Sequence, residues 1–269
     1  MPGRTSILFA LLFCTASSAL GQTAAEPSQF ELGKAAMAAH DPTAAIAHFE
    51  RAEGKQADAW LVAALMMESR SPSDQFVERA FEAAARSRAN DAARLRSRRD
   101  VAAALRPGEM VIAFLVGEQH AYAWAFDRDA LIGYPLPQPE EIATSVDLVN
   151  RYVGQDLRDG VQRIADELVP ALLGPVLDRA PELSRVIFVM DGPLRQLPMH
   201  QVLGGDTIPG ISRLPLSIVD DDALFEEVQR PAVPRDVPRW RSVQVTVILT
   251  AIAIVLVSLL ARRRSRERS

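Results

Sequence analysis

The sequence predicts α-helical repeat hairpins, followed by a partial α/β domain and one transmembrane helix. Residues 22–105 carry apolar side chains at helical spacing, with many alanines. Residues 106–228 contain strand-like apolar runs and longer helical segments, the pattern of an α/β fold. Residues 243–261 hold no charge and are long enough to cross a hydrocarbon core of about 30 Å.

Composition indicates a globular protein that does not bind nucleic acid. The 269 residues are 48% hydrophobic and 24% charged. The net charge is −4, but residues 262–269 hold five Arg and one Glu and carry +4, which leaves −8 for the rest. A mildly acidic body argues against nucleic acid as its partner. The preference for Arg over Lys and the abundance of Ala suggest a bacterial source.

The N-terminal segment, residues 1–21, is typical of a secretory signal peptide. A basic residue precedes the apolar run ILFALLF, and small residues just before Gln22 favour cleavage there. The alternative, a lipoprotein modified at Cys14, would require a small residue in place of Phe13. Cys14 is the only cysteine, so cleavage would leave no thiol nucleophile, disulfide or thiolate metal ligand.

Residues 29–54 are expected to form two short helices separated at Asp41-Pro42. A weaker second pair follows over 60–67 and 75–88. Both pairs resemble tetratricopeptide repeats, which stack into larger helical arrays. The residues that carry the resemblance are Leu32, Gly33, Ala45, Phe49 and Ala52. Because roughly three repeats are needed for stability, we expect these two to pack onto the next domain, a capping helix or a partner.

A helix over residues 90–105 is expected to cap this helical region. Arg106-Pro107-Gly108 then marks the boundary to the second domain. The charged residues of the capping helix indicate either a solvated face or a basic contact patch. The arginines concerned are Arg94, Arg96, Arg98 and Arg99.

The second domain is expected to alternate strands and helices. Apolar, β-branched composition at 185–190 predicts a strand buried on both faces, and a strand reached through a helix lies parallel in the same sheet. Asp191-Gly192-Pro193 ends it. The expected elements are strands over 110–117, 120–127, 131–136 and 185–190, a turn at Gly117-Glu118-Gln119, and helices over 140–152 and 157–179.

The segment 185–203, RVIFVMDGPLRQLPMHQVL, resembles the central motif of the CHAT family, caspase-like domains found behind tetratricopeptide repeats. Residues 105–109, LRPGE, residues 172–177, LLGPVL, and residues 211–222 resemble other segments of that family. The resemblance implies a caspase-like fold for the α/β domain. Family members that act as peptidases use a histidine base and a cysteine nucleophile on later strands. Because Pro-rich residues follow here, the resemblance implies a truncated domain without that catalytic half.

The sequence assigns no catalytic, cofactor-binding or metal-binding residue. A Ser-His hydrolase would need His200 beside Asp191 or Asp206 and beside Ser212 or Ser217, a combination that arises easily by chance. The resemblance gives His200 a packing role in a turn. The other histidines are His40, His48 and His120, and none has metal-ligand spacing.

Two further polar motifs carry no binding function. Asp220-Asp221-Asp222 lacks the spacing of a calcium loop and is expected to cap a helix that starts at Ala223. Gly204-Gly205 matches neither nucleotide-binding fingerprint.

The C-terminal region is expected to anchor the protein in a membrane. A Pro-rich linker, 229–242, leads to the transmembrane helix at 243–261 and a basic tail at 262–269. Trp240 would lie at the interface, and the positive-inside rule places the tail in the cytoplasm. We therefore expect a single-pass protein of the bacterial inner membrane, with its domains outside the cytoplasm. The alternative for 243–261 is a buried core helix.

The preferred function is a non-catalytic, membrane-anchored protein-interaction scaffold or pseudo-peptidase. An unidentified protein partner would bind the helical repeats or an open sheet edge. The alternative is half of a split caspase-like cysteine peptidase, whose His- and Cys-bearing strands come from a partner chain. A degenerate gene product is a third possibility, and the ordered succession of linker, apolar segment and Arg-rich tail speaks against it.

Overall fold

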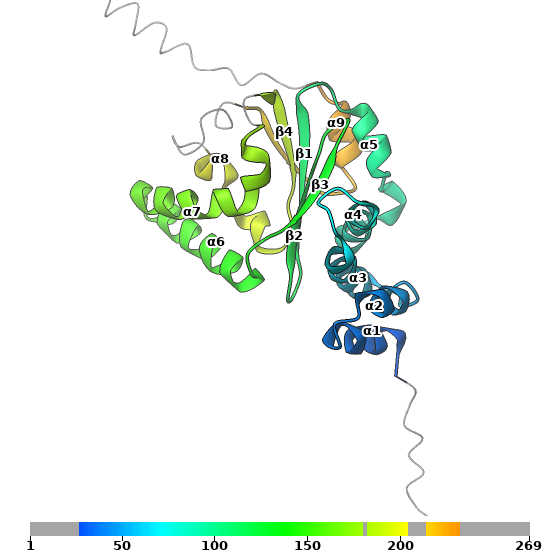
Figure 1. Ribbon diagram of the computed structural model, residues 1–269. Coiled ribbons are helices and arrows are strands. Elements are labelled where there is room, and N and C mark those ends of the chain that lie inside the picture. The colour runs from blue at the N-terminus through cyan, green and yellow to red at the C-terminus, as the bar shows by residue number, and fades with distance from the viewer. Residues whose placement is uncertain (1–26, 180–181, 204–213, 232–269) are drawn as a thin grey trace, which may run out of the picture.

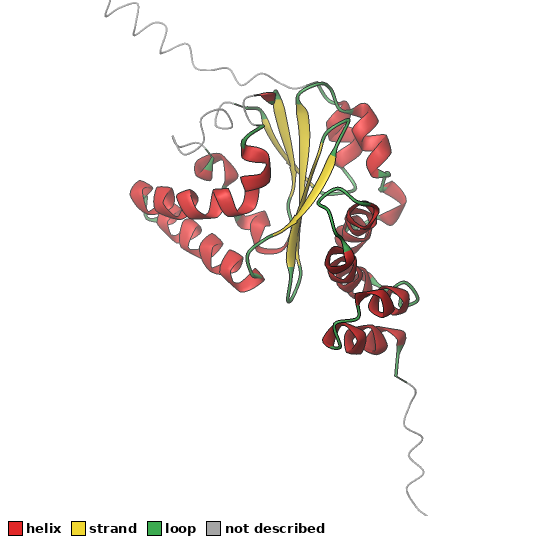
Figure 2. Cartoon of the chain, in the orientation of Figure 1, coloured by secondary structure: helices red, strands yellow, loops and turns green. Residues whose placement is uncertain are grey.

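The computed structural model describes residues 27–179, 182–203 and 214–231 (Figure 1). Over these residues a mixed sheet lies between two layers of helices (Figure 2). The strands are β1 (Glu109–Val116), β2 (Ala121–Phe126), β3 (Leu131–Pro135), β4 (Arg185–Val189) and β5 (Leu216–Val219). The α-helices are α1 (Gln29–Ala38), α2 (Pro42–Phe49), α3 (Lys55–Glu68), α4 (Gln75–Arg88), α5 (Arg98–Ala104), α6 (Pro139–Gly154), α7 (Arg158–Leu177), α8 (Met199–Val202) and α9 (Leu224–Gln229).

The strands are arranged in the order β3-β2-β1-β4-β5. The hairpins β1–β2 and β2–β3 are antiparallel, whereas β4 lies parallel to β1 and β5 parallel to β4. The prediction of a parallel strand at 185–190 is therefore confirmed. The chain crosses from β3 to β4 through α6 and α7, which is the length of connection that a parallel strand requires.

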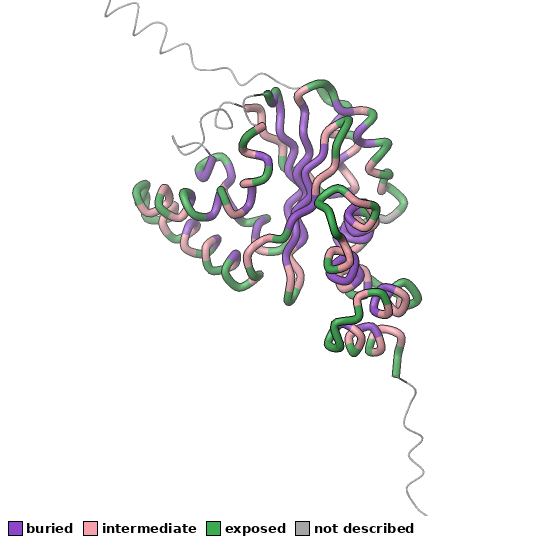
Figure 3. The backbone as a smooth tube through the Cα atoms, in the orientation of Figure 1, coloured by how far each residue is buried: buried purple, intermediate pink, exposed green. Residues whose placement is uncertain are grey.

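Burial on both faces explains why β1 and β4 are apolar almost throughout (Figure 3). Side chains alternate across a strand, so Ile112 and Phe114 pack with α6, α7 and α8, whereas Val111 and Leu115 pack with the N-terminal helices. Phe114 stacks on Phe188 of β4 with ring centroids 6.2 Å apart. The sheet is thus the shared wall of two hydrophobic cores.

The N-terminal helices form one of the two helical layers. Side chains of α1 to α5 and α9 belong to the same core as one face of the sheet. The expected break at Asp41-Pro42 is confirmed, because the Asp41 carboxylate accepts the Ala44 N–H at 2.9 Å and Pro42 occupies the first turn of α2. The second hairpin, α3–α4, lies against the sheet, whereas α1–α2 packs mainly on α3 (Figure 1).

The expected helix over 90–105 is wrong in its extent. A 3₁₀ turn (Ala92–Arg94) and the short α5 replace it, because the Ser97 hydroxyl accepts the Asp100 N–H at 3.2 Å and starts a new helix. Of the arginines here, Arg94 and Arg99 are mostly exposed to solvent, whereas Arg98 is largely buried. Arg98 and Arg99 both lie 3.4 Å from Glu78, and Arg96 lies over the Phe225 ring.

The C-terminal part of the sheet also differs from expectation. The sequence made 185–190 the last core strand, but β5 follows it and extends the sheet. β5 is only four residues long and begins after Pro215, so its apolar pattern is weak as a strand signal. The expected capping of α9 by Asp220-Asp221-Asp222 is wrong too, since no side chain caps this helix.

The predictions of a transmembrane helix and of a single-pass inner-membrane location are contradicted. Within the described ranges, every helix is too short or too polar to span a bilayer. The fold class is corrected accordingly to a mixed α/β sandwich with helical hairpins in one layer. The segments expected as signal peptide (1–21), transmembrane helix (243–261) and basic tail (262–269) lie outside the described residues, as does most of the linker (229–242).

Gly33 allows the α1–α2 hairpin to close over Phe49. A Cβ atom at this position would lie 2.5 Å from the Phe49 ring, and Phe49 is itself buried. Gly33→Ala should gain about 1 kcal/mol of helix propensity but lose about 1–3 kcal/mol to overpacking. We expect a net loss of about 1 kcal/mol in the free energy of unfolding, measured by denaturant titration.

Gly154→Ala is the matched control for this prediction. Gly154 ends α6, and a Cβ there would meet nothing within 4 Å. This variant should keep its stability or gain up to about 1 kcal/mol. Equal effects of the two substitutions would contradict the close approach of Gly33 to Phe49.

Candidate functional site

The turn Asp191-Gly192-Pro193, which follows β4, contacts the end of the neighbouring strand β1. The Asp191 carboxylate accepts the N–H of Val116 at 2.9 Å and so caps the end of β1. Gly192 has φ +52°, and a Cβ there would lie 3.2 Å from the Val116 side chain. The aspartate and glycine of the motif are therefore explained by backbone geometry, and Asp191 is already engaged.

Other carboxylates at this end of the sheet are engaged in the same way. Ligands of open α/β sheets bind outside the carboxyl ends of parallel strands, so residues after β4 and β5 are the first candidates. Asp221 is buried against Arg88, and Asp220 lies 3.3 Å from Arg195. At this end of the sheet, Asp221 is thus held in a buried ion pair, and Asp220 in a pair that is exposed to solvent.

Arg88 and Asp221 form a buried, bidentate ion pair. Two guanidinium nitrogens of Arg88 each donate to one Asp221 oxygen at 2.8 Å, and a third donates to the Phe114 carbonyl at 2.9 Å. The two side chains are only 1% and 3% exposed. The pair therefore connects the end of α4, the middle of β1 and the segment after β5.

A second buried charge cluster surrounds Arg185 at the other end of the sheet. Its guanidinium donates to Glu227, to the Ser217 hydroxyl at 3.1 Å and to the Arg230 carbonyl at 3.1 Å. Glu109 lies 3.5 Å away. Burial acts to raise the pKa of Glu227, but the hydrogen bond with Ser217 and the charges of Arg185 and Arg230 outweigh it and lower that pKa.

Among the described residues, His40, His48 and His120 form no hydrogen bond with a serine. His48 bonds the Gln29 amide at 2.9 Å, His40 takes a left-handed turn conformation, and His200 lies in α8. Ser217 contacts Arg185 rather than a histidine. Cys14, Asp206 and Ser212 lie outside the described residues. Within the same ranges, no group of three His, Cys, Asp or Glu side chains could hold a metal ion.

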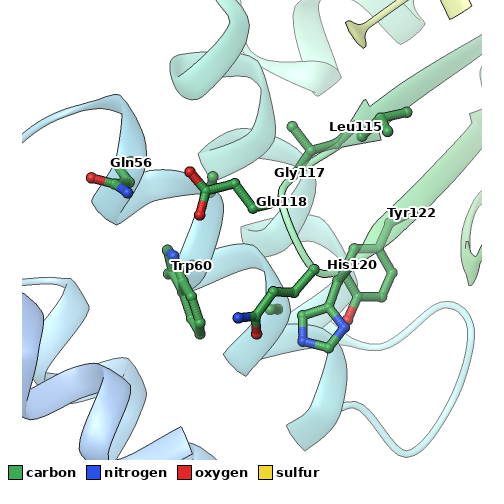
Figure 4. Close-up of a pocket in the computed structure, with 11 residues that line it drawn as sticks. Gln56, Trp60, Leu115, Gly117, Glu118, His120 and Tyr122 are labelled. Carbon is green, nitrogen blue, oxygen red and sulfur yellow. The ribbon is translucent and has the colours of Figure 1, made fainter. Parts of the chain in front are cut away.

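A cleft lies between α3 and the turn that joins β1 to β2 (Figure 4). It has a volume of about 310 Å³, near the lower end for small-molecule sites. Figure 4 shows the Glu118 side chain reaching across from the turn towards α3, where Gln56 and Trp60 lie, with His120 and Tyr122 on the strand side. The lining residues are Gln56, Ala59, Trp60, Ala63, Leu115, Val116, Gly117, Glu118, Gln119, His120 and Tyr122.

Packing holds the aromatic side chains of this cleft in place. The Trp60 ring lies 6.0 Å from the ring of Phe49 and 6.4 Å from that of Phe30. Tyr122 is 8% exposed, and burial raises its pKa to about 12, so its hydroxyl stays protonated at neutral pH. Sequence analysis placed these residues in separate elements and missed the cleft, because only the packing of α3 beside the hairpin brings them together.

The two edge strands, β3 and β5, differ in whether their outward-pointing peptide groups have hydrogen-bond partners among the described residues. At the β3 edge, the Gly133 N–H donates to the Pro72 carbonyl at 2.7 Å, so the loop before α4 covers that strand. At the β5 edge, the Leu216 and Ile218 peptide groups point away from β4 and meet no other described residue. Ile218 is also 48% exposed. β5 is therefore the less protected edge.

Comparison of the chain with protein-family models, with curated proteins and with solved structures gave no match. Neither the CHAT-domain description nor the tetratricopeptide description therefore has support from a family model. We correct both to what the structure shows, which is two helical hairpins packed on a mixed five-stranded sheet.

Removing one partner of the Arg88–Asp221 pair should be far more damaging than removing both. Arg88→Met leaves a buried carboxylate uncompensated and should cost about 3–5 kcal/mol in the free energy of unfolding. The double variant Arg88→Met/Asp221→Leu should return to within about 2 kcal/mol of the parent, with the orphaned Phe114 carbonyl as the remaining cost. Denaturant titration of the parent, of Arg88→Met, of Asp221→Leu and of the double variant measures this, and additive losses would contradict a coupled pair.

Glu227 should stabilise the fold at neutral pH and lose this effect in acid. Its folded-state pKa is lowered from 4.5, so its contribution is present above that value and disappears as the pH falls through the folded-state pKa. Glu227→Gln should cost about 1.5–3 kcal/mol at pH 7 and progressively less in acid. The exposed neighbour Glu226→Gln is the control and should change little at any pH. A pH-independent loss in Glu227→Gln would contradict the charge-based role.

Proposed function

We propose that this protein is a non-catalytic interaction scaffold that pairs through β5 with a strand of another polypeptide. Among the described residues, no segment covers the outward side of β5, and this is the observation that carries the proposal. An exposed edge strand offers a row of unpaired N–H and C=O groups, and extended segments of other chains bind such edges by adding a strand.

The hydrogen-bond ladder between β4 and β5 defines which backbone N–H and C=O groups of β5 point outwards, towards a partner strand. Val186 pairs with Leu216 in a parallel register, and its N–H donates to the Pro215 carbonyl at 3.1 Å. Bonding alternates along a parallel pair, so Pro215, Ser217 and Val219 direct their peptide groups towards β4. Leu216 and Ile218 direct theirs outwards, which gives an incoming strand two donors and two acceptors.

Side-chain chemistry at the edge also favours a strand partner. Leu216 and Ile218 share one face of β5, and the exposed part of Ile218 offers apolar surface beside the outward peptide groups. Natural sheets protect their edges with charges, proline or a covering segment. β3 has such protection from the loop before α4, and it ends at Pro135. The four residues of β5 carry no charge.

The distribution of charged groups supports a binding role over catalysis. Asp191, Asp221 and Arg185 are held by internal contacts that build the fold. The alternative, half of a cysteine peptidase completed by strands of a partner, remains a prediction that would use the same edge. No observation among the described residues favours it over simple strand pairing.

A second copy of the chain is the partner to test first. Antiparallel pairing about Ser217 would place Leu216 opposite Ile218 of the other copy, an apolar pair on each side of the two-fold axis. We expect the full chain to form dimers that dissociate on dilution in sedimentation velocity. Ile218→Lys should weaken dimerisation at least about tenfold, because a lysine on an edge strand disfavours pairing.

Leu157→Lys is the matched control, since Leu157 is also 48% exposed but lies between α6 and α7. It should leave the dimer unchanged. Thermal melting followed by circular dichroism must show that both variants are folded. A full chain that stays monomeric at all concentrations, or equal effects of the two lysines, would refute self-pairing through β5.

A further inference from the structure

We propose that the cleft between α3 and the β1–β2 turn binds a guanidinium group, an arginine side chain presented by another polypeptide. This second site is separate from the β5 edge and does not depend on the proposed function. The proposal rests on a free carboxylate, two fixed aromatic rings and a described lining without lysine or arginine.

Glu118 supplies the negative charge. It is exposed at the tip of the hairpin and makes no ion pair or hydrogen bond with any described residue. This distinguishes it from the carboxylates of Asp191 and Asp221, which are tied to internal partners. In Figure 4 its two oxygens lie over the cleft on the side of Gln56 and Trp60, where a carboxylate can accept two parallel N–H bonds.

Trp60 supplies a flat surface for the same group. The planar guanidinium stacks on aromatic faces, and tryptophan is the strongest partner for such cation–π contacts. Phe30 and Phe49 pack against the Trp60 ring, so little side-chain freedom remains to be lost on binding. Tyr122 adds a second ring, which is uncharged at neutral pH.

The rest of the lining suits a cation and excludes an anion. The neutral amides of Gln56 and Gln119 offer acceptors at the rim, and no Lys or Arg lines the cleft within the described residues. Lys55 precedes Gln56 in the chain but is not part of the lining. His120 is the one lining residue that can become positively charged.

The size and shape of the cleft favour an arginine over a larger ligand. A volume of about 310 Å³, open to solvent, holds a single side chain but little of an extended cofactor. Guanidinium is preferred over the ammonium of lysine because it combines bidentate hydrogen bonding with stacking. Glu118 would accept the hydrogen bonds, and Trp60 would provide the stacking surface.

The test uses the full-length chain and two small probes of equal shape. N-acetyl-L-arginine amide carries the guanidinium, and N-acetyl-L-citrulline amide replaces it with a neutral urea. We expect the arginine probe to shift the indole N–H signal of Trp60 in NMR spectra, with saturation and a dissociation constant on the order of 1 mM. The citrulline probe should bind at least about tenfold more weakly, because it forms no charge-assisted bond.

Variants then separate the roles of the two key residues. Glu118→Gln should weaken arginine binding about tenfold and bring it close to citrulline binding, and Trp60→Leu should weaken it about fivefold, monitored by the Glu118 amide signal. Glu140→Gln removes another exposed carboxylate, from α6, and should have no effect. Equal binding of the two probes, no saturable shift up to about 20 mM, or an unchanged affinity in Glu118→Gln would overturn the proposal.

Discussion

Burial of the central strands on both faces is the constraint on which the rest of the structure depends. β1 and β4 lie side by side in the middle of the sheet, and their side chains alternate between two hydrophobic cores. Neither face of such a pair tolerates water, so each requires its own layer of helices. Helices α3, α4, α5 and α9 supply one layer, with α1–α2 packed on α3, and α6, α7 and α8 supply the other. The helical region is therefore part of the same packing unit as the sheet.

Buried charges connect this sandwich at both ends. Arg88 reaches from α4 to the Phe114 carbonyl and to Asp221, and Arg185 holds α9 against the opposite end of the parallel strands. Such pairs add little net stability when compared with apolar substitutes, but each is costly to break. They join segments that are far apart in the sequence. Because these charged side chains bond to one another, they are not available to bind a ligand.

The two surfaces proposed for binding differ in chemistry. The β5 edge offers backbone hydrogen bonds and one exposed isoleucine, which suits an extended strand of almost any sequence. The cleft beside α3 offers Glu118 and Trp60, which suit one type of charged side chain. A scaffold that uses both could combine sequence-tolerant strand pairing with selection at a single position. The two surfaces are built from separate elements, so they can be altered independently.

The sequence by itself determined most secondary-structure elements, because their signals are local. The apolar run at 185–190, the Asp41-Pro42 break and the boundaries of α4 are read from neighbouring residues and agree with the structure. Local signals failed where a single side chain set the boundary, as with Ser97 at the start of α5. They failed again for β5, whose four residues form a strand only because β4 is beside them.

The membrane helix and the family names inferred from the sequence did not find support. Tertiary structure alone decided the partners of charged residues and the location of the cleft. Asp221 lies in an acidic triplet that suggests a helix cap, yet it forms a buried ion pair with Arg88 of α4, which is distant in the sequence. Glu118 and Trp60 likewise meet only through the packing of α3 against the hairpin. Periodicity reports which face of an element is apolar, but which elements meet depends on long-range packing that no local pattern encodes.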